Sequence, residues 1–285
     1  MVGRGKWRWI AALVAVAACH RAPAANAEVQ ADEPDVGEDA EVAALADAPS
    51  ASDALPGDVT VAAPTNVLFI GNSYTYVNDL PTMTAQFAHA GGVTIHPTAV
   101  TQGGATLAVM IAQTQAVAAI GQGGWTYVVL QGQSVEPAAD LTHFLASAKT
   151  LAEDAKQVGA AVAFYQTWPR KAGDALYSEA WTGGTPQALA KLLHDGYDKA
   201  AVQNAGVRVP VGDAWLLTLT QHPEINLYQD DGSHPVVAGT YLAACVFATA
   251  LFHVDPAAVT WAPVDLPAPQ ASALRAMCRA ATQNP

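Results

Sequence analysis

Short apolar runs alternate with longer stretches of helical periodicity from about residue 64 onward. Strands are expected where apolar residues run together or alternate with polar ones, at 66–70, 93–100, 127–130, 161–165 and 207–211. Helices are expected where apolar positions recur at helical spacing, at 80–90, 106–120, 141–158, 186–205, 236–252 and 270–281. Glycine follows several of these helices, as is common at helix C-termini.

This alternation predicts the fold class. Short apolar strands separated by helices of about 10–20 residues indicate an α/β protein whose parallel sheet is covered on both faces. We expect a three-layer α/β/α sandwich with a five-stranded parallel sheet, of the flavodoxin-like type. In such sheets the functional site lies at the carboxyl ends of the strands. The polar residues that follow each strand are therefore the candidates for chemistry.

The first 19 residues have the pattern of an export signal. Arg4, Lys6 and Arg8 precede an apolar run of about nine residues, which is too short to span a bilayer. Small residues directly before Cys19 resemble a bacterial lipobox, and that resemblance implies that Cys19 is lipidated and becomes the mature N-terminus. An ordinary signal peptide that contains Cys19 is the alternative. We therefore expect an exported protein, either an outer-membrane lipoprotein or a protein of the periplasm or cell surface.

Residues 20–63 form a second N-terminal segment. They are rich in Ala, Pro, Asp and Glu and include no aromatic residue, so they cannot bury enough apolar area to offset their chain entropy. We interpret the segment as a disordered acidic linker that holds a domain away from a membrane; an acidic binding arm is the alternative. The expected organisation is a signal peptide at 1–19, this linker, and one folded domain at 64–285.

Composition narrows the classes of partner. The 285 residues carry a formal net charge of −12, which argues against nucleic acid and against an anionic membrane surface as partners. Contact with a membrane is expected only through the lipid anchor. The sequence has no zinc-type Cys/His spacing and no phosphate-binding loop, and we expect no metal and no organic cofactor.

The chain contains three cysteines. Besides Cys19, Cys245 and Cys278 lie in apolar helical patterns near the C-terminus. An oxidising compartment would allow a disulfide between them, but two separate buried thiols are the slightly favoured interpretation.

A candidate nucleophile follows the first buried strand, in the sequence Gly71-Asn72-Ser73. Gly71 permits a tight turn, so that Ser73 would present its hydroxyl at the edge of the sheet. A helix N-terminus would begin there, and its free backbone N–H groups can stabilise an oxyanion. The alternative is a helix cap, a position that both Asn72 and Ser73 suit.

Two further polar clusters follow the second and third strands. Gly103-Gly104 precedes a helix, where backbone N–H groups can face a ligand. Gln131-Gly132-Gln133 places two side-chain amides at the end of a buried strand, and such amides can donate to an oxyanion without carrying a titrating charge. A simple turn and loop capping are the respective alternatives.

The fourth cluster, Asp231-Gly232-Ser233-His234, precedes the apolar helix expected at 236–252. His234 is a base that can activate a serine hydroxyl. Asp231 lies three residues earlier and can bond the imidazole Nδ1, which fixes the tautomer in which Nε2 accepts the serine proton. A surface histidine beside a helix-capping aspartate is the alternative.

The four clusters together resemble the SGNH (GDSL-like) hydrolases over about residues 66–252. The resemblance implies a serine esterase in which Ser73 is the nucleophile and His234 and Asp231 are its catalytic partners. It also implies that the backbone N–H groups of Ser73 and of Gly103 or Gly104 hold the oxyanion.

The third cluster departs from that family, because its usual Gly-x-Asn-Asp block is absent. Gln131-Gly132-Gln133 is instead similar to the Gln-Gly-Glu signature of the sialate and acetyl-xylan esterase branch. This similarity implies Gln131 as the side-chain oxyanion donor, with Gln133 close behind.

The substrate is expected to be a small-molecule or glycan ester, preferably an O-acetyl or other short acyl group on a carbohydrate. Trp168 follows the fourth strand and either stacks on a sugar ring or packs under the loop; Tyr74 is a similar rim candidate. No large apolar lid is visible, which disfavours a lipase or thioesterase. A non-catalytic glycan-binding surface lipoprotein is the other alternative, although the complete Ser, Asp and His set argues against it.

Overall fold

The computed structural model describes residues 65–283. The expected signal peptide (1–19) with its lipidation site Cys19 and the expected linker (20–63) lie outside the described residues, and these expectations stay predictions. Within residues 65–283, no helix is long and apolar enough to cross a membrane.

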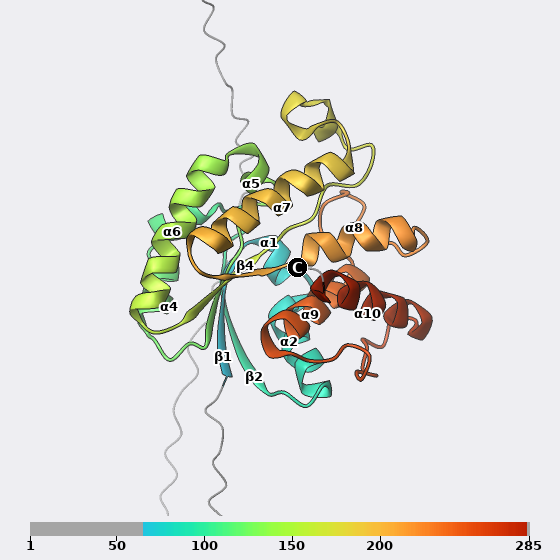
Figure 1. Ribbon diagram of the computed structural model, residues 1–285, viewed down its shortest axis with the longest axis horizontal. Coiled ribbons are helices and arrows are strands. Elements are labelled where there is room, and N and C mark those ends of the chain that lie inside the picture. Colours follow the sequence, from blue (N-terminus) through green and yellow to red (C-terminus); the bar gives the residue numbers. More distant parts are fainter. Residues whose placement is uncertain (1–64, 284–285) are drawn as a thin grey trace, which may run out of the picture. The chain divides into compact units, whose positions relative to one another are not determined.

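A parallel sheet of five strands forms the centre of the fold (Figure 1). The strands are β1 (Thr65–Gly71), β2 (Ile95–Thr101), β3 (Tyr127–Leu130), β4 (Ala161–Tyr165) and β5 (Val207–Val209). They pair in the order β2-β1-β3-β4-β5, every pair parallel. This is the order of flavodoxin-like folds, and the predicted fold class is confirmed.

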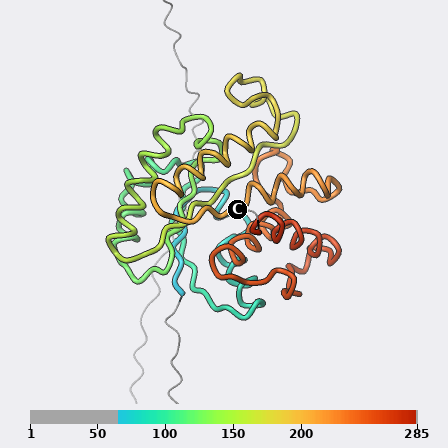
Figure 2. Tube along the Cα trace, in the orientation of Figure 1, coloured from blue at the N-terminus to red at the C-terminus, as the bar shows by residue number. Residues whose placement is uncertain are grey.

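Helices cover both faces of the sheet. Successive side chains of each strand point to opposite faces, so an apolar strand gives both faces an apolar surface for helices to pack on. In β1, Leu68 and Ile70 pack against one helical layer, whereas Val67 and Phe69 pack against the other. The first layer contains α3 (Leu107–Ala112), α4 (Gln115–Gly121), α6 (Leu141–Gln157) and α7 (Pro186–Gln203). The second contains α2 (Leu80–Ala90), α8 (Val211–Gln221), α9 (Val237–Phe252) and α10 (Ala268–Gln283). Figures 1 and 2 show the two groups on opposite sides of the strands.

Short elements occupy the loops at the carboxyl ends of the strands. They are α1 (Ser73–Tyr76), η1 (Val77–Asp79), α5 (Glu136–Ala139), η2 (Ala175–Ser178) and η3 (Ala180–Thr182). The first of these follows β1 directly and carries the candidate nucleophile.

Two helices differ from the sequence expectation. The helix expected at 106–120 is divided into α3 and α4 at Thr114, whose φ of 59° lies in the left-handed region and breaks the helix. Helix α8 was not predicted. The strand expected at 207–211 ends at Val209, since Pro210 cannot donate a ladder hydrogen bond, and α8 begins at Val211.

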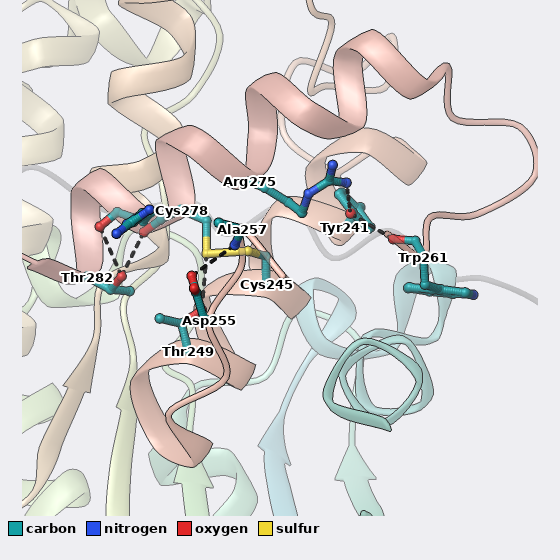
Figure 3. The surroundings of a disulfide bond; sticks show 10 residues. Tyr241, Cys245, Thr249, Asp255, Ala257, Trp261, Arg275, Cys278 and Thr282 are labelled. Carbon is teal, nitrogen blue, oxygen red and sulfur yellow. Dashed lines mark hydrogen bonds between the residues drawn. A yellow bond between two sulfur atoms is a disulfide. The ribbon is translucent and has the colours of Figure 1, made fainter. Parts of the chain in front are cut away.

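Helix α9 lies inside the second layer, and its surroundings explain its nearly uniform apolar sequence. It packs against α2, α8 and α10. Its Cys245 forms a disulfide with Cys278 of α10 (Figure 3). The slightly favoured expectation of two separate thiols was therefore wrong, since helical packing brings the two Cα atoms to 6.1 Å. Nearby, Arg275 of α10 donates to the Tyr241 hydroxyl of α9 at 3.0 Å.

The disulfide is expected to stabilise the domain measurably. The two cysteines are 33 residues apart, and closing a loop of that length stabilises a protein by about 2–4 kcal/mol, chiefly by restricting the unfolded chain. Urea unfolding should show a free energy of unfolding lower by this amount in the reduced protein and in the Cys245→Ala/Cys278→Ala variant than in the oxidised protein. Equal free energies of unfolding for the oxidised and reduced wild-type protein would contradict the prediction.

Candidate active site

The turn after β1 frees the hydroxyl of Ser73. Asn72, not Ser73, caps α1: its side-chain Oδ1 accepts a hydrogen bond from the backbone N–H of Tyr74 at 3.1 Å. Ser73 is the first residue of α1, where a backbone N–H has no partner in the preceding turn. The capping alternative considered for Ser73 therefore applies to its neighbour, and the serine hydroxyl is left for another partner.

The side chain of Gln131 lies beneath this turn and is fully buried. Its Oε1 accepts from the Asn72 N–H at 3.0 Å and from the Thr75 hydroxyl at 2.9 Å. Its Nε2 donates to Asn72 Oδ1 at 2.9 Å and to the Gly132 carbonyl. Both amide hydrogens are thus used inside the protein. The expectation that Gln131 donates to the oxyanion disagrees with the structure, in which this side chain holds the turn and does not line the cavity.

Gly71 is required by the same close packing. A Cβ atom at this position would lie 2.5 Å from both Gln131 Oε1 and Thr75 Oγ1. The glycine therefore serves close approach of side chains beneath the turn.

Gln133 lies on the wall of the cavity above the serine. Its Oε1 accepts from the Val135 N–H at 3.1 Å, which leaves Nε2 as the end of the amide available to a ligand. Its own N–H donates to Glu136 Oε2 at 2.9 Å. Burial raises the pKa of the Glu136 carboxyl, although hydrogen bonds from backbone N–H groups oppose the shift. Gln133 is thus fixed by its backbone N–H and by its side-chain oxygen.

The loop after β2 brings one of the two candidate glycines to the cavity. Gly104 lines it, with a φ of 69° that favours glycine over other residues. Gly103 is exposed and is not part of the lining.

A short hairpin-like loop carries the aspartate and the histidine. Tyr228 and Pro235 form a β-bridge at its base, and the Gln229 N–H donates to the His234 carbonyl at 2.8 Å. Asp231 Oδ2 bonds His234 Nδ1. On the other side of the ring, His234 Nε2 lies 2.8 Å from Ser73 Oγ. The structure therefore joins the three side chains in one hydrogen-bonded chain.

The carboxylate of Asp231 is stabilised in its charged form. Partial burial acts to raise its pKa, but the bond with the His234 ring and the N–H groups of His234 and Ser233, both 2.9 Å from Oδ1, outweigh it and lower the pKa to about 2. Asp231 is therefore ionised at neutral pH and can orient the imidazole.

An aromatic stack supports the histidine loop from below. Trp168 is 1% exposed and lies between Tyr74, at 4.3 Å between ring centroids, and Trp215 of α8, at 4.0 Å. Its Nε1 donates to the Ser233 carbonyl at 3.0 Å, and the Tyr74 hydroxyl lies 2.8 Å from Ser233 Oγ. Trp168 packs under the loop, so the sugar-stacking interpretation disagrees with the structure. Tyr74 lines the cavity but is 2% exposed.

A half-open cavity of about 180 Å³ lies above the serine. Its lining residues are Asn72, Ser73, Tyr74, Gly104, Gln133, Ser134, Arg170, Ser233 and His234. Ser134, Arg170 and Ser233 were not predicted to line the site, and Trp215 was not predicted to join the stack. The signal available for Ser134 and Arg170 was their position in the polar loops that follow strands β3 and β4.

Comparison with solved structures identifies similar proteins. A protein from Slackia heliotrinireducens that is assigned to the SGNH hydrolases is 30% identical, with a TM-score of 0.57 over 66% of this chain and 99% of that one. A DUF4886 family protein from Bacteroides uniformis is 18% identical, with a TM-score of 0.66 over 78% and 96%. The acetyl xylan esterase AlAXEase is 15% identical, with a TM-score of 0.52 over 65% and 99%. The latter two likenesses show the fold alone.

No protein-family model matches the sequence, and no curated protein matches it significantly.

Proposed function

Because the chain belongs to the SGNH (GDSL-like) hydrolases and is thus a hydrolase that acts on esters, we propose that it works through a catalytic triad of Ser73, His234 and Asp231. One observation carries the proposal: His234 bonds Ser73 Oγ through Nε2, at 2.8 Å, and Asp231 through Nδ1. This is the arrangement in which an imidazole takes a proton from a serine hydroxyl while a carboxylate fixes its tautomer.

Acylation begins when Ser73 Oγ attacks the ester carbonyl and His234 Nε2 takes the hydroxyl proton. The ionised Asp231 stabilises the imidazolium that forms, without itself becoming protonated. As the tetrahedral intermediate collapses, His234 gives its proton to the leaving alcohol. A water molecule then repeats the sequence on the acyl-serine: His234 deprotonates it, the acid leaves, and the Ser73 hydroxyl is restored.

Three donors are proposed for the oxyanion. The backbone N–H groups of Ser73 and Gly104 and the side-chain Nε2 of Gln133 belong to residues that line the cavity. Gln133 is preferred over Gln131 because its Nε2 has no partner among the described residues, whereas both hydrogens of Gln131 are engaged. Such donors act without reorganisation when the charge develops.

The preferred substrate is a short acyl ester, such as an O-acetyl group on a carbohydrate. The small volume of the cavity supports this preference. A lipase or thioesterase would need an apolar groove for a long chain beside the serine.

Export is proposed together with this function. The Cys245–Cys278 disulfide supports it, since disulfides persist mainly in oxidising compartments. A lipid anchor at Cys19 would then be the link to a membrane.

A fluorophosphonate probe tests the function against a non-catalytic glycan-binding alternative. We expect the full-length protein to hydrolyse p-nitrophenyl acetate and to be labelled once by the probe, with the modification on Ser73 by peptide mass spectrometry. The Ser73→Ala variant should carry no label. A folded wild-type protein that neither hydrolyses the ester nor takes the label would favour the glycan binder.

A further inference from the structure

One guanidinium, that of Arg170, lines the active-site cavity without an ion-pair partner among residues 65–283. Arg170 follows β4 and lines the cavity together with Ser73 and His234. Among residues 65–283, no ion pair includes Arg170. What sets Arg170 apart from the other unpaired cations of the described residues is its place in the lining of this cavity.

The hydrogen-bonding capacity of Arg170 is also largely unused. Its Nη2 donates to Ser134 Oγ at 3.1 Å. Its Nε is buried and has no hydrogen-bond partner among the described residues. A buried donor without a partner is destabilising, and more so when it is charged. The guanidinium of this cavity-lining residue is thus held by a single side-chain hydrogen bond, from Nη2.

The acidic residues nearest in sequence and in the site are engaged elsewhere. Asp174 Oδ1 accepts from the Leu176 N–H at 2.8 Å. Asp231 is bonded by the His234 ring and by two backbone N–H groups. The cavity lining itself contains no aspartate or glutamate.

We infer that the substrate carries a carboxylate close to the scissile ester, and that Arg170 binds it. A carboxylate accepts two hydrogen bonds from a guanidinium side by side, in a geometry that fixes the orientation of the ester. This inference rests on the proposed function and narrows its substrate class to esters of acidic molecules. The carboxylate belongs either to the alcohol, as in an acidic sugar, or to the acyl group, as in a dicarboxylic monoester.

Matched ester pairs test the inference and distinguish the two sources. For the alcohol side, the acetate esters of 4-hydroxybenzoate and of its neutral amide are compared; for the acyl side, monoethyl succinate and its neutral amide analogue. For each pair, kcat/KM for the carboxylate ester is divided by kcat/KM for the amide. In the pair that matches the source of the carboxylate, we expect this ratio to be about 10- to 100-fold lower in Arg170→Gln than in the wild type, the size expected for charge-assisted hydrogen bonds. Arg170→Lys should keep part of the preference.

Lys171→Gln is the matched control, because it removes the same charge one residue away, from an exposed side chain outside the cavity. It should keep the wild-type ratio. Fluorophosphonate labelling of Ser73 and thermal unfolding verify that each variant is folded. If wild type and Arg170→Gln give the same ratio in both arms, the inference is overturned while the proposed function stands. A wild-type protein that hydrolyses no ester and takes no label overturns both.

Discussion

Replacing Ser73 with alanine is expected to lower kcat/KM for a short-chain ester by about 10⁴-fold or more. The Oγ atom that lies 2.8 Å from His234 Nε2 is then missing, and no acyl-enzyme can form. The fold should survive, because Asn72 rather than Ser73 caps α1. Steady-state hydrolysis of p-nitrophenyl acetate measures the loss, and the unfolding midpoint verifies the fold.

His234→Ala provides the control for this result. Residues that act as a unit in one reaction have non-additive effects. We therefore expect the double variant Ser73→Ala/His234→Ala to be about as slow as either single variant. Retention of activity in folded Ser73→Ala would remove the serine from the mechanism, and multiplicative losses would show that the two residues act independently.

The second large effect separates the two glutamines after β3. Gln133→Ala is expected to lower kcat by about 10²- to 10³-fold, the usual consequence of removing one oxyanion donor, with little change in stability. Gln131→Leu is expected to lower the free energy of unfolding by about 2–5 kcal/mol, because it leaves the buried Asn72 N–H and Thr75 hydroxyl without their acceptor.

Urea unfolding and steady-state kinetics on the same two preparations decide between them. Leucine has nearly the volume of glutamine, so the change at position 131 tests hydrogen bonding and not packing volume. If Gln131→Leu is as stable as the wild type but has a lowered kcat, while Gln133→Ala keeps full activity, then Gln131 and not Gln133 is the oxyanion donor.

The sheet and the hydrogen-bonded set of Ser73, His234 and Asp231 were predictable because they depend on local and topological rules. Continuous apolar runs such as Val67–Ile70 indicate buried strands, and parallel strands place their following residues at one edge. The D-x-x-H spacing brings Asp231 to the His234 ring within a single turn, so no distant contact was needed to predict that pair.

The roles of Gln131 and Trp168 depended on contacts that the sequence does not display. Gln131 turns inward because Asn72 and Thr75, from the neighbouring strand end, offer it partners. Trp168 is buried because Trp215, on a helix that was not predicted, stacks on its other face. A residue that follows a strand can be placed at the site from sequence alone, but the direction of its side chain depends on its tertiary neighbours.

The hydrogen bonds of the Gln131 amide make four positions depend on one another, which limits how this turn can evolve or be engineered into another protein. Gly71 leaves the space, Asn72 and Thr75 supply the partners, and Gln131 fills the position between them. A change at one of these four positions is tolerated only with a compensating change at another. We expect them to vary as a set among descendants of this chain, and an engineer who grafts the serine onto another scaffold must move all four with it.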